Sequence, residues 1–396
     1  MSAPRRGAIA SEGGFDEAEL RALARAQTGL ADFGPDDHRD GLRLLLRTYD
    51  ENPFHARGRA RNRLQVLRWL ATRLRVVDAL RRHPEIRARR IRAPWFLTGM
   101  PRSGTSALFN LLAADPSARA LLNWEARIPE PLEGHPPGAP DPRRAALEAS
   151  YERGRAEQRA FSAMHYTSVD TPEECVLLMG SSFQGVQTGV EVMLEPYASW
   201  YRDQPREALY AWYADLLRLL DWQRPGERWL LKTPAHLWGI GALLARFPDA
   251  RIVWSHREPV VGIASLCSLT HLLMSAWMEV DPAALGPRVL DFYATSLERG
   301  MAARQSCDPA RFVDVHHDEI AADPMAVVER IHARFERPLT GSLRDAIAAH
   351  ARAHPKGKHG EHRYRLEDYG LREAAVRERF AAYRERFAID RAAQAR

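Results

Sequence analysis

The first 90 residues carry apolar side chains at the spacing of amphipathic helices. Residues 15–27 and 36–49 each place an apolar stripe along one side of a helix. A longer, arginine-rich segment over 59–82 repeats leucine and valine at helical intervals. None of these segments contains a pattern that suggests chemistry. The sequence therefore predicts an N-terminal helical extension over residues 1–90 that caps the core of the protein.

A different pattern begins near residue 91, where short apolar runs alternate with helical segments. Strands that alternate with helices predict a mainly parallel sheet with helices on both faces. The fold class is therefore α/β, and residues 91–396 form one domain. The predicted strands are 94–98, 228–232, 251–256 and 311–316, and the predicted helices are 104–114, 235–247, 260–278 and one that starts at 324.

The segment 259–278 contains no acidic residue, lysine or arginine, and it is long enough to resemble a membrane span. Its serines, threonine and histidine, and its position directly after a predicted strand, favour a buried helix instead. No apolar signal segment is visible at the N-terminus, and the three cysteines are far apart. These features predict a cytoplasmic protein without a disulfide framework or a zinc site.

The chain has 396 residues and a formal charge of +6, from 57 lysines and arginines against 51 acidic residues. Either a solvated basic surface or an anionic ligand explains this excess. The arginines are spread along the chain rather than gathered in one stripe, which disfavours a nucleic-acid partner. Only three of the basic residues are lysines, at positions 232, 356 and 358.

A glycine-containing loop joins the first predicted strand to its helix. Residues 99–106 read Gly-Met-Pro-Arg-Ser-Gly-Thr-Ser and have the spacing of a phosphate-binding loop, except that Thr105 replaces the usual lysine. Backbone amides in such a loop, and the positive end of the following helix, attract an anion. Arg102 can add a bidentate cation. A P-loop kinase or NTPase-like phosphoryl transferase stays open as an alternative, although the missing lysine disfavours it.

This loop resembles the 5′-phosphosulfate loop of sulfotransferases that use 3′-phosphoadenosine 5′-phosphosulfate (PAPS). Bacterial sulfotransferases and the related tyrosylprotein sulfotransferases have the form with arginine before Ser-Gly-Thr. The resemblance implies a P-loop-type α/β enzyme that moves a sulfuryl group from PAPS to an acceptor hydroxyl and releases 3′-phosphoadenosine 5′-phosphate, with no metal. The residues implied to hold the phosphosulfate are Arg102, Ser103, Gly104, Thr105 and Ser106.

Two further motifs extend the resemblance. Arg257 follows the predicted strand 251–256, and Ser265 lies eight residues later. In sulfotransferases an arginine and a serine at these positions hold the 3′-phosphate of PAPS, a dianion that a guanidinium and a hydroxyl can share. Lys232 ends the strand 228–232 in a Lys-Thr-Pro sequence. The resemblance implies that Lys232 points toward the transferring group.

Transfer to a hydroxyl requires a general base, and two residues are candidates. Glu125 lies in a Glu-Ala-Arg-Ile-Pro stretch similar to the one that contains the base of tyrosylprotein sulfotransferases, and it is favoured. A structural carboxylate paired with Arg127 is the other interpretation of Glu125. His236 follows Lys232 at a position close to that of the histidine in cytosolic sulfotransferases, but a structural role at a helix N-terminus also explains it.

Three acidic residues near position 170 have two interpretations. They either shape the acceptor pocket or begin a helix. They are Asp170, Glu173 and Glu174. The acceptor itself is expected to be a small molecule, lipid or carbohydrate with a hydroxyl. The aromatic residues between 143 and 222 favour one that is partly apolar, although buried helices also need aromatic residues.

A basic, glycine-rich segment lies near the C-terminus. It resembles the C-terminal segment of bacterial sulfotransferases, which folds over the nucleotide. The resemblance implies that Lys356, Lys358 and Arg363 contact the 3′-phosphate side of the donor. A basic loop without this role explains the segment equally well.

Overall fold

The computed structural model describes residues 13–132, 134–135, 139–154, 168–186, 189–353 and 364–389. Five parallel strands form one sheet in the order β2-β3-β1-β4-β5. This confirms the predicted α/β class and the parallel sheet. The strands are β1 (Trp95–Gly99), β2 (Ala118–Ala120), β3 (Arg228–Lys232), β4 (Arg251–His256) and β5 (Phe312–His316).

The sequence pattern predicted four of these strands and missed β2. Because β2 has only three residues, it is too short to show an apolar alternation. It lies at the edge of the sheet and pairs with β3 alone. The remaining strands fall within a residue of their predicted positions.

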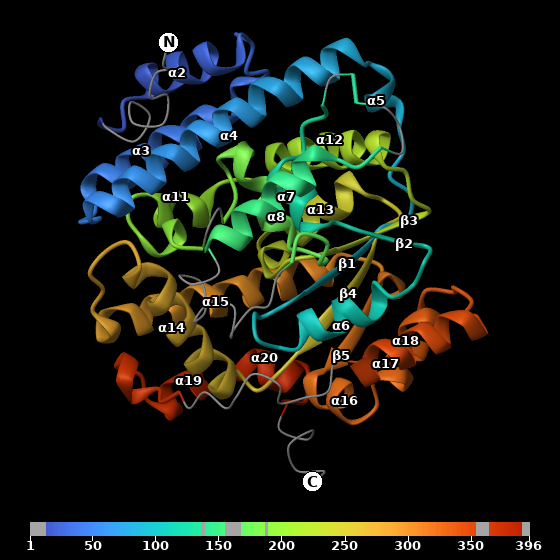
Figure 1. The fold of residues 1–396 in the computed structure, drawn as a ribbon. Coiled ribbons are helices and arrows are strands. Elements are labelled where there is room, and N and C mark those ends of the chain that lie inside the picture. The colour runs from blue at the N-terminus through green and yellow to red at the C-terminus, as the bar shows by residue number, and fades with distance from the viewer. Residues whose placement is uncertain are drawn as a thin grey trace.

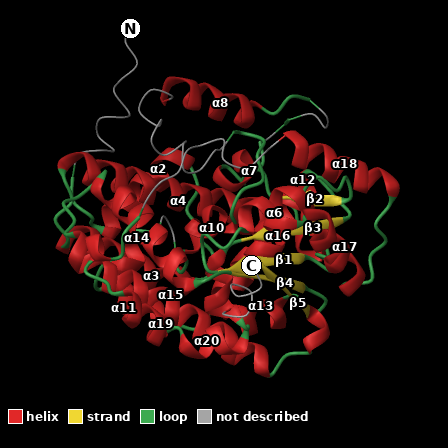
Figure 2. Cartoon of the chain, turned by 90° about the horizontal axis from the view of Figure 1, so that it is seen from below, coloured by secondary structure: helices red, strands yellow, loops and turns green. Residues whose placement is uncertain are grey.

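Helices surround the sheet on both faces (Figures 1 and 2). Before β1 they are α2 (Glu17–Thr28), η1 (Asp36–His38), α3 (Arg39–Glu51), α4 (Ala56–Arg82) and α5 (Glu85–Ala88). Between β1 and β3 they are α6 (Thr105–Leu112), α7 (Asn123–Arg127), α8 (Pro142–Gly154), α10 (Cys175–Met179), η2 (Gly180–Ser182), η3 (Glu191–Met193), α11 (Tyr197–Asp203) and α12 (Glu207–Gln223).

The later helices follow the remaining strands along the chain. Between β3 and β5 they are η4 (Pro234–Gly239), α13 (Ile240–Arg246), α14 (Pro259–Ser275), α15 (Pro282–Gln305) and η5 (Pro309–Arg311). After β5 they are α16 (His317–Ala322), α17 (Pro324–Arg334), α18 (Gly341–Ala353), η6 (Glu367–Tyr369), α19 (Glu373–Arg379) and α20 (Ala381–Arg386).

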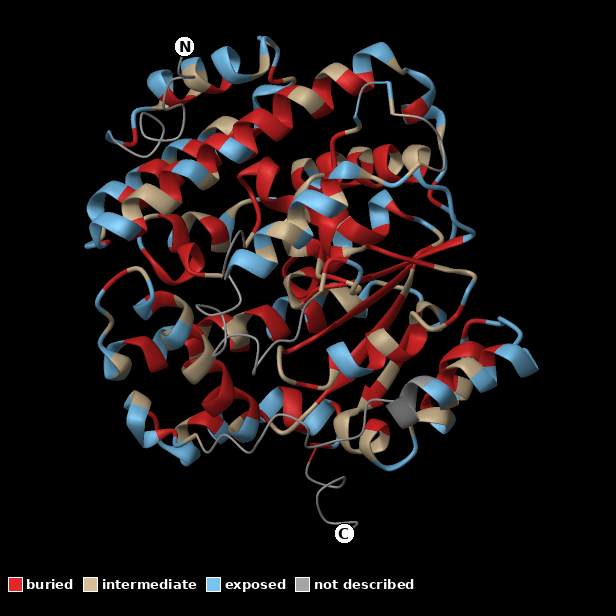
Figure 3. Cartoon of the chain, in the orientation of Figure 1, coloured by how far each residue is buried: buried red, intermediate tan, exposed pale blue. Residues whose placement is uncertain are grey.

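Alternate side chains of the strands enter two separate cores, as the period of an extended chain requires. On one face Trp95 and Leu97 pack with α6, α17 and α18. On the other face Phe96 and Trp254 join a larger core with α12 to α15. Figure 3 shows the strands buried at the centre of the molecule. Strands covered on both faces lack a solvent-facing side, which explains their near-continuous apolar sequences.

The N-terminal helices share the larger of these two cores. Leu70 and Leu74 of α4 belong to the same buried cluster as Leu217 of α12 and Leu231 of β3. The helical character predicted for this region is therefore observed, and its apolar stripes face the sheet domain. The boundary at residue 90 between an extension and a domain stays a prediction.

One predicted helix differs in type from the helix that is observed. The helix predicted over 235–247 begins as the 3-10 helix η4 and becomes α-helical only from Ile240. Thr233 caps η4 by accepting a hydrogen bond from the amide of Ala235, and Pro234 occupies its first position. The uncharged segment after β4 forms α14, which is buried along one side. In the part of the chain that the structure describes, no helix is long and apolar enough to cross a membrane.

Gly99, at the end of β1, is a position where the fold requires glycine. Its φ angle is +143°, and an added Cβ would lie 2.3 Å from the carbonyl oxygen of Ser255 on β4. We therefore expect Gly99→Ala to lower the free energy of unfolding by roughly 1–3 kcal/mol or more, because both strain and overlap oppose the change. Urea unfolding followed by circular dichroism measures this effect.

Gly241 on α13 provides the matched control, because an added Cβ there meets open space. Gly241→Ala should leave stability unchanged or raise it by about 0.4–1 kcal/mol. Equal midpoints for the two variants would contradict the close strand packing at Gly99.

Candidate active site

The carboxyl ends of the strands meet at one edge of the sheet. In the strand register Leu97 pairs with Lys232, and Gly99 pairs with Ser255. The loop after β1, the end of β3 and the end of β4 therefore lie side by side. In open α/β sheets this edge is where ligands bind.

The glycine-containing loop turns between β1 and α6 as its sequence predicts. Arg102 and Gly104 have φ angles of +68° and +85°, which lie in the left-handed region. Gly104 packs so closely that an added Cβ would lie 3.0 Å from the ring of His317. The Oγ atoms of Ser103 and Ser255 are 2.6 Å apart, so a hydrogen bond ties the loop to β4. This turn presents the N-terminus of α6, where helix amides are without partners, to the edge of the sheet.

The structure brings the second motif into contact with this loop. Arg257 donates from Nη1 to the carbonyl oxygen of Arg102 at 2.7 Å. Arg102 in turn donates from Nε to Oγ of Ser265 on α14 at 3.2 Å. Arg257 and Ser265 lie 155 and 163 positions after Arg102 in the sequence, yet these hydrogen bonds join all three residues in one cluster. The positions of both motifs at strand ends, and the resemblance to sulfotransferases, led to the expectation that they lie close together.

The cluster has an excess of positive charge. Among the described carboxylates, none forms an ion pair with Arg102 or Arg257. Burial lowers the pKa of Arg257, and the neighbouring guanidinium of Arg102 lowers it further, while Asp318 acts in the opposite direction. Two neighbouring guanidiniums that form no ion pair with a described carboxylate can bind an anion with more than one negative charge.

Glu258 is not the partner of Arg257 that its position in sequence suggests. Its side chain accepts from the amide of Val260 and so caps α14. It also faces Arg384 of α20 at 3.6 Å and Arg377 of α19 at 4.0 Å. The carboxylate adjacent to Arg257 is therefore engaged by the C-terminal helices.

A buried network behind Arg257 holds the end of β4. His256 contacts Oδ1 of Asp314 at 2.9 Å through Nε2 and the hydroxyl of Tyr383 at 3.1 Å through Nδ1. The ring of Phe387 stacks on the His256 ring with centroids 4.0 Å apart. Arg304 donates two hydrogen bonds to Asp314 at 2.6 and 2.8 Å. These contacts fix the backbone from which Arg257 projects.

Lys232 lies at the other side of the loop. Its Nζ atom donates to Oγ of Ser106 at 3.1 Å and forms an ion pair with Oε1 of Glu174 at 2.6 Å. Thr233 contacts the second oxygen of Glu174 at 3.4 Å. Glu174 occupies the N-cap position of α10, and a bridge between Leu122 and Pro172 holds the chain that precedes it. The sequence left two interpretations of Glu174 open, an acceptor pocket or the start of a helix. In the structure Glu174 caps α10 and, through Lys232, lies next to the loop 99–106, here called the phosphate loop.

A cavity of about 220 Å³ opens next to Glu174. Pro101 of the phosphate loop borders it, so the cavity reaches the site where the anion is expected. Its walls are mainly apolar and come from α10, η4, α14 and α15. They include Leu177, Trp238, Leu266, Leu269, Leu273 and Phe292. The site thus joins a cationic loop, a carboxylate and an apolar pocket.

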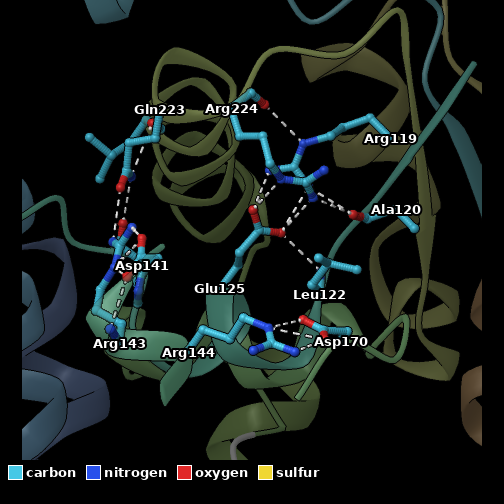
Figure 4. A network of polar contacts seen from close by, with 12 residues as sticks. Arg119, Ala120, Leu122, Glu125, Asp141, Arg143, Arg144, Asp170, Gln223 and Arg224 are labelled. Carbon is cyan, nitrogen blue, oxygen red and sulfur yellow. Dashed lines mark hydrogen bonds and ion pairs between the residues drawn. The ribbon is translucent and has the colours of Figure 1, made fainter. Parts of the chain in front are cut away.

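Glu125, which the sequence favours as the general base, is surrounded by arginine side chains (Figure 4). It is 1% exposed. Arg119 donates to both of its oxygens at 2.7 and 2.8 Å, and Arg224 does so at 3.0 and 3.1 Å. The amide of Leu122 donates to Oε2 at 3.0 Å. The carboxylate is therefore paired as a structural group would be, but its partners are Arg119 and Arg224 rather than Arg127.

The electrostatics of Glu125 also favour a structural role. Burial acts to raise its pKa, but the charge of Arg119 and the hydrogen bonds from both guanidiniums outweigh burial and lower it. A carboxylate with a lowered pKa, and with both oxygens engaged by cations, accepts a proton poorly. The catalytic role of Glu125 stays a prediction that these contacts do not support.

His236, the second predicted base, is fully buried on the core side of η4. Its ring lies near the rings of Phe96 and Tyr210, and its Nδ1 atom is 3.0 Å from the Tyr210 hydroxyl. Burial lowers its pKa to about 3. These contacts match the alternative interpretation, a structural position at a helix N-terminus.

The basic segment near the C-terminus is predicted to contact the donor. Lys356, Lys358 and Arg363 lie outside the described residues. In the described ranges, no group of three or more histidine, cysteine, aspartate or glutamate side chains is arranged to hold a metal ion.

The family is established by comparison with known proteins. A family model for sulfotransferases matches residues 94–341, and the chain belongs to this family. The solved structure of sulfotransferase STF1 from Mycobacterium tuberculosis H37Rv has 32% sequence identity and a TM-score of 0.81, covering 93% of this chain and 98% of its own. Sulfotransferase STF9 from Mycobacterium avium has 30% identity and a TM-score of 0.85, covering 96% and 98%.

A curated relative adds information about one member of the family. Omega-hydroxy-beta-dihydromenaquinone-9 sulfotransferase Stf3 of Mycobacterium bovis is 25% identical over 268 residues, which is 65% of this chain and 67% of Stf3. The predicted activity, sulfuryl transfer, is confirmed by these matches, and the fold is that of its structural neighbours. Nothing in them supports the phosphoryl transferase that the sequence left open.

The network around Glu125 leads to a prediction about stability. In Glu125→Gln the buried Arg119 keeps its charge but loses its ionic partner. We expect the free energy of unfolding to fall by roughly 3–5 kcal/mol, as when one member of a buried pair is removed. Glu148 is a suitable control because its side chain is 52% exposed and pairs with Arg144 at the surface. Glu148→Gln should change stability little; similar losses in both variants would argue against a structural role for Glu125.

Proposed function

We propose that PAPS is the sulfuryl donor and that two motifs at the edge of the sheet bind its two anionic ends. The observation that carries this proposal is the convergence of Arg102 and Arg257 without a described carboxylate partner. PAPS has a 5′-phosphosulfate and a 3′-phosphate, and it supplies an activated sulfuryl group. The phosphosulfate is assigned to Arg102, Ser103, Gly104, Thr105 and Ser106, and the 3′-phosphate to Arg257 and Ser265.

The acceptor in this proposal is a hydroxyl on a mainly apolar molecule. The apolar walls of the cavity beside Glu174 support this assignment, because an apolar body gains free energy when it leaves water for such a pocket. Stf3, a relative of this chain, is an omega-hydroxy-beta-dihydromenaquinone-9 sulfotransferase. A small lipophilic alcohol is therefore the acceptor class that we assign.

Glu174 is the general base that the contacts favour over Glu125. One of its oxygens contacts Lys232, and the carboxylate borders the acceptor cavity. In the proposed step the acceptor oxygen forms a bond to sulfur, the bond from sulfur to the 5′-phosphate oxygen breaks, and the hydroxyl proton passes to Glu174. The proton is then on Glu174, and the leaving group is 3′-phosphoadenosine 5′-phosphate. The proposed step uses no metal ion.

Lys232 and the phosphate loop have the complementary role of stabilising negative charge. The ammonium group of Lys232 lies 3.1 Å from Ser106 Oγ, on the loop assigned to the phosphosulfate. It would face charge that develops on the sulfuryl group and on the departing phosphate oxygen. Fixed donors of this kind lower the barrier because they need no reorganisation during the reaction. The role of Lys232 is the one that the sequence predicts.

Three expectations from the sequence stay predictions. They are the contact of Lys356, Lys358 and Arg363 with the donor, the cytoplasmic location and the absence of a nucleic-acid partner.

Removal of the Arg257 guanidinium tests how the donor is bound. We expect Arg257→Ala to weaken binding of 3′-phosphoadenosine 5′-phosphate by roughly 10–100-fold, which corresponds to the loss of charge-assisted hydrogen bonds. Adenosine 5′-phosphosulfate lacks the 3′-phosphate, so its affinity should change much less. Isothermal titration calorimetry with both nucleotides measures the difference. Arg365, which is 72% exposed, gives the control Arg365→Ala; equal weakening of both nucleotides would remove the assignment of Arg257.

The choice of base is tested by two isosteric substitutions. In Glu174→Gln we expect kcat for transfer from PAPS to 1-octanol to fall by ~10²–10⁴, because a neutral amide cannot take the proton. Binding of 3′-phosphoadenosine 5′-phosphate should persist, since Glu174 is not among its ligands. Glu125→Gln should keep most of its kcat when the rate is expressed per folded molecule. The opposite pattern, with loss of turnover only in Glu125→Gln, would return the role of base to Glu125.

A further inference from the structure

Another cavity borders α10. Its volume is about 190 Å³, and its walls come from α4, α7 and the region of α10 and η2. Three arginine side chains line it: Arg61 and Arg68 from α4, and Arg127 from the end of α7. Among the described residues that line it, none is an aspartate or a glutamate. The cavity is therefore positively charged.

The arginines of this cavity lack acidic partners within the described residues. Arg127 donates from Nε to Oδ1 of Asn123 at 2.8 Å. Arg61 donates to Oδ1 of Asn62 at 3.0 Å, and its guanidinium lies over the Trp277 ring. These neutral partners fix the direction of two guanidiniums and leave their charge in place.

Glu130 is the acidic group closest to balancing the third arginine, Arg68. Its carboxylate is already bound by Arg75 at 3.1 Å and contacts Thr72. Burial lowers the pKa of Arg68, and the charges of Arg127 and Arg61 lower it further, whereas Glu130 opposes them. The positive charge around Arg68 therefore exceeds the negative charge that the described side chains supply.

This arginine-lined cavity meets the apolar acceptor cavity at Leu177, which lines both. Glu174 borders the acceptor cavity, and Leu178, four residues later on α10, borders the arginine-lined one. Four residues of α-helix rise by only about 6 Å. A molecule with its hydroxyl at Glu174 can thus extend along α10 and reach the guanidiniums with a short apolar spacer.

We propose that the cavity of Arg61, Arg68 and Arg127 binds an anionic group of the acceptor, so that the acceptor is an amphiphilic alcohol with a hydroxyl, an apolar spacer and an anion. This inference rests on the proposed acceptor site at Glu174. Carboxylate, phosphate and sulfate share the geometry that guanidinium groups bind. The anion fixes the register of the acceptor, and its hydroxyl is held at the base. Arg127, in the Glu-Ala-Arg stretch of the sequence, then acts in acceptor binding.

The experiment compares ligands that differ only in the charged end. Calorimetric titrations use the protein saturated with 3′-phosphoadenosine 5′-phosphate and a series of ω-hydroxycarboxylates with six to twelve carbons. The α,ω-diol of the same length is the neutral counterpart of each acid. We expect at least one acid to bind roughly tenfold or more tightly than its diol, which is the scale of a charge-assisted hydrogen bond. Added salt should reduce this preference.

Two variants connect the preference to the cavity. Arg68→Gln should remove most of the preference for the acid, because it deletes the guanidinium whose charge interacts with those of both Arg61 and Arg127. Arg81→Gln is the matched control: Arg81 lies on the same helix, is 69% exposed and pairs with Asp78. The control removes the same charge at a distance and should keep the preference. Thermal melting of both variants verifies that they are folded.

The outcomes separate this inference from the proposed function. Transfer of sulfuryl from PAPS to the diols is measured in parallel. Transfer to diols without any preference for the acids, or a preference that Arg68→Gln and Arg81→Gln reduce equally, overturns the anion site. An Arg68-dependent preference supports the anion site even if no transfer to a hydroxyl is found, and that absence of transfer would instead overturn the proposed acceptor chemistry.

Discussion

The proposed site is built around two neighbouring arginines, Arg102 and Arg257, that form no ion pair with any described carboxylate. Arg257 donates to the backbone of Arg102, so the groups are held together although their charges repel. Such an arrangement is unfavourable in the free protein and becomes favourable when an anion binds between them. Much of the surrounding structure keeps it in place. Gly99 and Gly104 allow the tight loop, and the C-terminal helices engage Glu258, the acid adjacent in sequence.

The protein places two glutamates in opposite electrostatic settings. Glu125 has two arginines and a backbone amide around it, so its negative charge is stabilised and its pKa is lowered. Glu174 has the Lys232 ammonium at one oxygen and the Thr233 hydroxyl, at 3.4 Å, at the other. Each glutamate lines a cavity, so the difference lies in the number of cations around each carboxylate. A carboxylate whose charge is balanced by two guanidiniums accepts a proton poorly, and one with a single cationic partner accepts it more readily. The proposed division of roles between the two residues rests on this difference in charged partners rather than on residue type.

The short helix α10 organises the acceptor side of the molecule. Its N-cap, Glu174, lies beside Lys232 at the carboxyl edge of the sheet, and Leu177 lines both the apolar cavity and the cationic one. The helix is itself held by the bridge between Leu122 and Pro172. In the proposed function, the donor is bound by strand ends and their loops, and the acceptor is bound by helices. One fold can act on different substrates when the strand ends that bind the donor stay the same and the helices that bind the acceptor change.

The sequence alone determined the strands β1, β3, β4 and β5, the phosphate loop and the proximity of its Arg102 to Arg257, because apolar runs, glycine turns and parallel strand ends are local or nearly local properties. Only the tertiary structure decided which charged groups meet. Glu174 reaches Lys232 across 58 positions, and Glu125 reaches Arg224 across 99. No periodicity records such contacts, since they arise from the packing of whole elements. For the same reason the burial of His236 and the edge strand β2 became visible only in the folded chain.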